Sequence, residues 1–132
     1  MRKYAQGTSV SIDRSMAEIR KAITKHAALE RFAQLQEGNR VGLQFGIGGR
    51  LVRFTMILPE DGDDKETRRM WRCLVLCIKS KLESVASGIV TFDEEFMAQL
   101  VTPNGRTFGE VALPQYTKAI ESGKPLPPLL GM

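Results

Sequence analysis

The chain contains few of the residues that usually carry catalysis or bind metals. Its 132 residues include one histidine, His26, and two cysteines, Cys73 and Cys77. A hydroxyl-nucleophile triad needs an oriented base beside its nucleophile, and no stretch resembles a nucleophile elbow. These three residues have the spacing of no closed zinc site, and a fourth ligand is not identifiable. We therefore expect no enzyme, metal or cofactor, and we interpret both cysteines as reduced thiols in the core of a cytoplasmic protein.

Long apolar runs are also missing. No run approaches the roughly 20 residues of a membrane-spanning helix, and the first ten residues lack the apolar core of a signal peptide. We expect no membrane contact and a cytoplasmic location. The length suits one domain over residues 1–132, whose proline-rich tail, 124–132, either packs as an extended arm or stays mobile. The net charge of +4 permits binding to nucleic acid or to an acidic partner.

Residues 31–58 alternate between apolar and polar side chains as three antiparallel strands do. A glycine cluster followed by an arginine, at residues 45–54, could be a phosphate loop, but that loop must lead into a helix. Here alternation continues to Leu58, so we interpret Gly48 and Gly49 as a tight hairpin turn. That register pairs apolar residues on one face, and on the other face it places Gln44 opposite Arg53.

The preceding hairpin determines what else lies on this second face. A three-residue loop over Glu37–Asn39 predicts that Ala33 and Leu35 join the apolar face, while Phe32 and Gln34 point to the second face beside Gln44. The second face is then the most informative surface in the sequence. The alternative is that Gly42 and Gly46 form a shallow groove in which a helix packs.

Helical periodicity dominates the rest of the chain. One helix begins near Ser11–Asp13, and the longest helix spans about Lys65 to Ser87 behind an Asp63 cap. The long helix has a wide apolar stripe and, along its other edge, a basic line of Arg68, Arg72 and Lys79. A capping box at residues 91–94 begins a short helix, a second hairpin turns at residues 103–105, and a last helix starts at Pro114 and ends at Gly123.

These elements predict an α+β fold. We expect a two-layer arrangement in which an antiparallel sheet, the meander from about 31 to 58, packs against helices, followed by the C-terminal hairpin and a short helix.

Three stretches carry a resemblance to a known group of proteins. They are Ser15 to Ile19, Thr91 to Phe96 and Pro103 to Thr107, which fit the patterns S-x-A-E-I, T-F-x-E-E-F and P-x-G-R-T. The sequence thereby resembles a group of small bacteriophage- and prophage-encoded proteins with no assigned activity. The resemblance implies a mobile-element origin and a host-cell cytoplasmic setting, and it implies no functional residue.

Two functions follow as hypotheses. The first is a small non-enzymatic accessory protein that binds DNA or RNA. Phe32 would stack on a base, and Gln34 and Gln44 would donate or accept hydrogen bonds. The residues expected to neutralise phosphates are Arg50, Arg53, Arg68, Arg72 and Lys79.

The alternative is a protein-binding module. It would act as a phage inhibitor or adaptor on a host defence or replication complex, or associate as a homodimer. The apolar residues that favour it are Leu51, Ile57, Leu76, Leu126, Leu129 and Leu130.

Overall fold

The computed structural model describes residues 10–59 and 63–127, and these form a three-stranded antiparallel sheet and four α-helices. The α+β prediction is confirmed. The predicted roles of Leu129 and Leu130, and the end of the proline-rich tail, fall outside the described residues. In chain order the elements are α1 (Ile12–His26), β1 (Leu29–Glu37), β2 (Arg40–Ile47), β3 (Arg50–Ile57), α2 (Asp64–Ala86), α3 (Phe92–Glu95), the 3-10 helix η1 (Met97–Gln99) and α4 (Phe108–Ser122).

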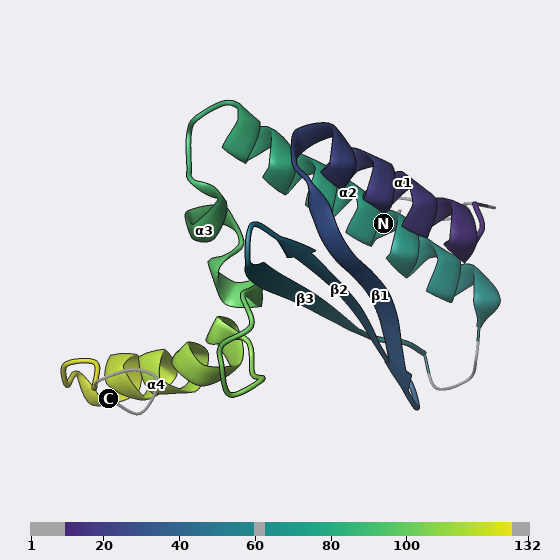
Figure 1. The fold of residues 1–132 in the computed structure, drawn as a ribbon. Coiled ribbons are helices and arrows are strands. Elements are labelled where there is room, and N and C mark those ends of the chain that lie inside the picture. Colours follow the sequence, from purple (N-terminus) through teal and green to yellow (C-terminus); the bar gives the residue numbers. More distant parts are fainter. Residues whose placement is uncertain (1–9, 60–62, 128–132) are drawn as a thin grey trace.

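The core is one cluster of buried residues to which the sheet and the helices α1 and α2 contribute; Figure 1 shows where these elements lie. From β2 it takes Val41, Leu43 and Phe45, whose side chains are almost completely buried. Phe96, which follows α3, closes the core with its ring edge-on to that of Phe45 at a centroid distance of 6.3 Å. The helices contribute their apolar stripes, which include Ile19, Ile23, Trp71, Leu74, Val75, Ile78 and Leu82.

Helices α1, α2 and α3 begin after the capping residues that predicted them. The hydroxyl of Ser11 accepts from the backbone N–H of Arg14, and the carboxylate of Asp63 accepts from two backbone N–H groups at the start of α2. Thr91 and Glu94 form the predicted capping box at the start of α3. In Figure 1, helices α1 and α2 lie side by side and run in the same direction. Among the described residues, no helix is long and apolar enough to cross a membrane.

The β2–β3 hairpin has the predicted register. Gly48 and Gly49 form its turn with positive φ angles of 56° and 77°, conformations that glycine adopts without strain. Phe45 lies opposite Val52, and Gln44 lies opposite Arg53.

The predicted β1–β2 register is wrong by one residue. Glu37 pairs with Arg40, so the loop contains only Gly38 and Asn39, and Gly38 has a φ of 62°. A two-residue turn is the shortest that a hairpin allows, and a one-residue shift moves every side chain of a strand to the opposite face. Phe32 therefore lies opposite Phe45 and Gln34 opposite Leu43, on the helix side of the sheet.

The C-terminal region also differs from its prediction. Among the described residues, the predicted second hairpin consists of one isolated bridge, between Val101 and Thr107. Helix α4 begins directly after Thr107 and contains Pro114, which was predicted to start it. Proline has no N–H to donate to the carbonyl of Glu110, and the guanidinium of Arg106 donates to that oxygen instead at 3.2 Å. This replacement explains how the helix accommodates the proline.

Candidate functional site

The second sheet face is a groove with arginines at its centre. Nε of Arg53 donates to the side-chain oxygen of Gln44 at 3.0 Å, and its Nη1 donates to the Gly105 carbonyl at 3.0 Å. A hollow of about 510 Å³ extends from Arg53 to Arg40 and Thr55, with Glu110 of α4 at its rim. An adjoining hollow of about 380 Å³ is lined by the same arginines and by residues of η1 and α4, among them Ala98, Gly109 and Leu113. The groove on the second sheet face is therefore lined by polar side chains, and the beginning of α4 forms one of its walls.

Two of the predicted binding residues are not in this groove. Phe32 is half-buried against the core on the helix side, and the guanidinium of Arg20 lies over its ring at 5.3 Å from the centroid. Gln34 is exposed on that same helix side. The second face thus keeps Gln44 and Arg53 but has lost the aromatic ring that would stack on a base.

The remaining predicted residues are dispersed. Arg50, beside the β2–β3 turn, forms an ion pair with Asp93, and its Nη2 donates at 2.8 Å. This pairing raises the pKa of Arg50 and lowers that of Asp93. Arg68 is half-buried on α2, away from the second sheet face. The eight predicted residues therefore do not form one surface.

Arg72 and Lys79 meet on Glu18 of α1. Nη2 of Arg72 donates to one carboxylate oxygen at 3.1 Å, and Nζ of Lys79 donates to the same oxygen at 2.6 Å. Two hydrogen bonds, of which that from Arg72 has the larger effect and that from Lys79 the smaller, lower the pKa of Glu18 to about 2. Glu18 is consequently ionised throughout the neutral range and holds both cations across the α1–α2 contact.

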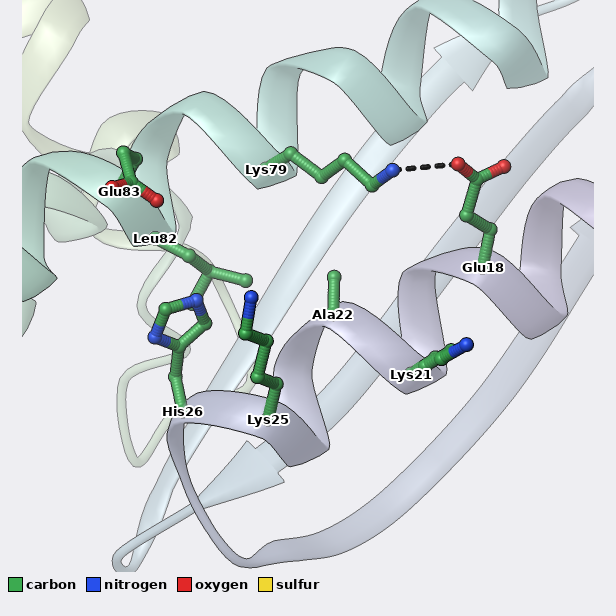
Figure 2. A pocket seen from close by; sticks show the side chains of 8 residues that line it. All are labelled: Glu18, Lys21, Ala22, Lys25, His26, Lys79, Leu82 and Glu83. Atoms are coloured by element: carbon green, nitrogen blue, oxygen red, sulfur yellow. Dashed lines mark hydrogen bonds and ion pairs between the residues drawn. The ribbon is translucent and has the colours of Figure 1, made fainter.

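The cluster of Glu18, Arg72 and Lys79 is called the Glu18 clamp below. A second groove lies beside it, between α1 and α2. It has a volume of about 390 Å³. In Figure 2, Lys25 and His26 of α1 face Leu82 and Glu83 of α2 across this space, and Lys79 is joined to Glu18 at its end. Within the described part of the chain, the ammonium groups of Lys21 and Lys25 have no hydrogen-bond or ion-pair partner.

The two helices concentrate the positive charge of the protein. Together α1 and α2 contain ten Lys and Arg residues against five Asp and Glu residues, a net charge of +5. The whole chain has a net charge of +4, so the rest of the sequence is slightly negative. The net positive charge of the chain therefore lies on the helix pair α1 and α2.

Helix α4 presents an apolar stripe to solvent. Leu113, Tyr116 and Ile120 follow one another at helical spacing and are 59%, 55% and 65% exposed. Figure 1 shows α4 extending away from the sheet and from the α1–α2 pair. Of its fifteen residues, only Gly109 is buried.

The first turn of α4 attaches it to the body. The Thr107 hydroxyl accepts from the N–H of Glu110 at 3.2 Å, and the Phe108 N–H donates to the Leu100 carbonyl at 2.8 Å. Gly109 lies so close to η1 that an added Cβ would be 2.9 Å from the Ala98 carbonyl oxygen. The motif Thr107–Glu110 repeats the capping pattern recognised at residues 91–94, and it is the sequence signal that could have located this helix start.

Among the described residues, no group of three or more His, Cys, Asp or Glu side chains could hold a metal ion. No protein-family model, curated protein or solved structure matches the chain. The three surfaces described above, namely the second sheet face, the α1–α2 groove and the α4 stripe, are therefore the basis for a functional assignment.

Proposed function

We propose that the protein is a protein-binding module whose helix α4 inserts its apolar stripe into a groove of a partner protein. The observation that carries this proposal is the exposure of Leu113, Tyr116 and Ile120 on one side of a helix that is attached by its first turn. An isolated helix of this length is only marginally stable in water, because most helical stability in proteins comes from packing an apolar face. A partner that covers the stripe would supply the missing packing.

The spacing of the stripe fits a known mode of recognition. Amphipathic helices that bind grooves use anchors at positions i, i+3 and i+7, which is the spacing of Leu113, Tyr116 and Ile120. Acidic residues flank the stripe, since α4 contains Glu110 and Glu121 against one lysine. We infer a partner groove that is apolar at its centre and basic at its rim.

In this proposal, the sheet and the α1–α2 pair form two layers that hold α4 at one end. A rigid body with one protruding helix is suited to an adaptor or an inhibitor, including the phage-type adaptor acting on a host complex in the cytoplasm that the sequence suggested.

The test is site-specific photo-crosslinking in the cells that express the protein. A photoreactive residue at Ile120 should cross-link to one protein, and the same residue at Lys118, away from the stripe, serves as the control. The captured protein is then purified, and its affinity is measured for the unmodified chain and for Ile120→Ser. We expect at least a tenfold loss of affinity, since burying an isoleucine is worth about 1.5–3 kcal/mol. Equal cross-linking at both positions, or equal affinity, would contradict the proposal.

A second function is favoured by the charge of the helix pair. We propose that the α1–α2 groove contacts nucleic-acid phosphates, because its Lys21 and Lys25 ammonium groups are available and the pair has a net charge of +5. This proposal moves the predicted DNA- or RNA-binding surface from the sheet to the helices, where Lys79 lines the groove and Arg72 is bonded to Glu18 beside it.

Binding of a fluorescent mixed-sequence DNA at several salt concentrations tests this second function. In the double variant Lys21→Gln/Lys25→Gln, the slope of log affinity against log salt should become shallower by about 1.4 to 1.8, the contribution of two phosphate contacts. Lys118→Gln on α4 is the matched control and should leave the slope unchanged. Identical slopes for all three proteins would reject the groove as a phosphate-contacting surface.

A further inference from the structure

Strand β1 is an exposed edge of the sheet. It spans nine residues, Leu29–Glu37, and only Leu29 and Phe32 among them are even half-buried. Natural edge strands are usually blunted by proline, by charged side chains and above all lysine, by bulges or by short length. This strand contains no proline or lysine. Its charged residues Glu30, Arg31 and Glu37 lie towards its two ends, and its register shift also lies at one end, between Leu29 and Arg31. From Arg31 to Glu37 the edge is regular, and no strand among the described residues pairs with its outer side.

The hydrogen-bond pattern shows which backbone groups of β1 point outward. The Leu51 carbonyl of β3 accepts from the Val101 N–H at 2.8 Å, on the side of β3 that faces away from β2. Antiparallel ladders alternate, so the neighbouring Val52 bonds to Phe45 of β2. By the same alternation, the β2 residues that bond to β1 are Gly42, Gln44 and Gly46, and their partners are Leu35, Ala33 and Arg31. The outward N–H and C=O groups of β1 therefore belong to Phe32, Gln34 and Gln36.

This alternation restricts how a second copy of β1 can pair with the first. In an antiparallel pair, outward-pointing residues must face one another, so the two-fold axis must pass through a residue and cannot pass between two residues. Axes through Ala33, Gln34 and Leu35 are the central choices.

Only one of these axes places the opposite charges of Arg31 and Glu37 face to face. An axis through Gln34 places Arg31 opposite Glu37 of the second copy, twice in the dimer, and places Ala33 opposite Leu35. An axis through Ala33 would place Arg31 opposite Leu35, and an axis through Leu35 would place Glu37 opposite Ala33. Opposite charges facing each other across a ladder stabilise it, and Leu35, which is 45% exposed, would gain apolar contact.

We propose that two copies of this protein associate through β1, antiparallel and with Gln34 on the two-fold axis, to form a continuous six-stranded sheet. Neither Arg31 nor Glu37 has an ion-pair partner within the described residues, so both are available to the second copy. The dimer would carry two copies of α4, and a partner with two grooves would bind with the higher avidity of a bivalent ligand.

Sedimentation equilibrium over a range of micromolar concentrations tests this pairing by charge exchange. Arg31→Glu and Glu37→Arg should each weaken dimerisation on the order of tenfold or more, because each places two pairs of like charges face to face. The double variant Arg31→Glu/Glu37→Arg restores both ion pairs and should regain the affinity of the original protein to within about threefold. A structural role of either residue within one copy would not produce this rescue.

A proline substitution tests the backbone hydrogen bonds. Gln34→Pro removes an outward N–H that the β1–β2 ladder does not use, so the monomer should fold and the dimer should be lost. Gln34→Ala, which keeps the N–H, is the control and should dimerise. Circular dichroism of both variants verifies that the fold is retained.

Three results would overturn the proposal. The first is a monomer at about 100 µM, a concentration at which even weak association is populated. The second is a dimer that survives Gln34→Pro and Arg31→Glu but dissociates with Ile120→Ser, which would place the interface on α4. The third is protection of the Phe32, Gln34 and Gln36 amides from hydrogen exchange in a monomer, which would assign the edge to residues of the same chain.

Discussion

Helices α2 and α4 both carry apolar stripes at helical spacing, but the molecule treats them differently. The stripe of α2 is covered by the sheet and by α1, and its Ile78 is completely buried. The stripe of α4 is open, and its Ile120 is 65% exposed. Burial stabilises the folded chain, whereas exposure of a similar stripe costs stability unless another molecule covers it. This difference is the basis of our proposal that α2 serves folding and α4 serves binding.

The largest expected effect comes from shortening a side chain in the covered stripe. Ile78→Ala leaves a cavity in the core cluster to which Ile78 belongs, and we expect the free energy of unfolding to fall by about 2–5 kcal/mol. Urea denaturation followed by circular dichroism measures this loss. A change below about 1 kcal/mol would mean that α2 is less tightly packed than its burial indicates.

The next effect is at the attachment of α4. Gly109→Ala places a Cβ 2.9 Å from the Ala98 carbonyl oxygen and 3.3 Å from the Ala98 Cβ, so α4 must shift away from η1. Overpacking of this kind costs about 1–3 kcal/mol, here confined to the C-terminal region. Hydrogen exchange should speed up in α4 and remain unchanged in α2. Thr117→Ala, on an exposed position of α4, is the control, and equal exchange in both variants would argue against this attachment.

A smaller, pH-dependent effect is expected at the Glu18 clamp. Its pKa is lowered from the ordinary 4.5 to about 2 by Arg72 and Lys79, so the folded state prefers the ionised carboxylate. The stabilisation is complete above pH 4.5 and is lost as the pH falls from 4.5 to about 2, because the unfolded chain takes up the proton first. With partial solvent screening we expect about 1–2 kcal/mol. The stability of Glu18→Gln should vary less over this range, and equal variation would show that the clamp contributes nothing.

The smallest effect on stability is expected for a side chain in the exposed stripe of α4. Ile120→Ala is the same chemical change as Ile78→Ala, but its side chain is already in water, so the free energy of unfolding should change by less than about 0.5 kcal/mol. A loss comparable to that of Ile78→Ala would show that α4 packs within its own chain.

The sequence predicted the elements whose signals are local. The stripe and the cap of α2, and the turn at Gly48 and Gly49, follow from periodicity and from turn chemistry that tertiary contacts do not alter. The β1–β2 turn was ambiguous because β1 has apolar residues on both faces, with Phe32 on one and Leu35 on the other. Its short turn, Gly38–Asn39, was the signal that should have decided the register.

The candidate sites were less predictable for a physical reason. Exposure of α4 results from where its first turn attaches, at Gly109 against Ala98, and a periodic stripe looks the same whether or not something covers it. The pairing of Arg72 and Lys79 with Glu18 likewise depends on α1 lying beside α2. Periodicity identifies a helix as amphipathic, but which residues cover each of its faces is a property of the assembled fold.

Hydrogen exchange of the purified protein, with residue resolution, tests the central claim most directly. If α4 is attached only by its first turn, the amides of Leu113 and of residues 115–122 should exchange at least a hundredfold faster than the buried amides of α2 around Val75 and Ile78, a difference of about 2.7 kcal/mol in opening free energy. Protection of α4 equal to that of α2 in the isolated protein would contradict the claim, because the stripe would then already have its partner.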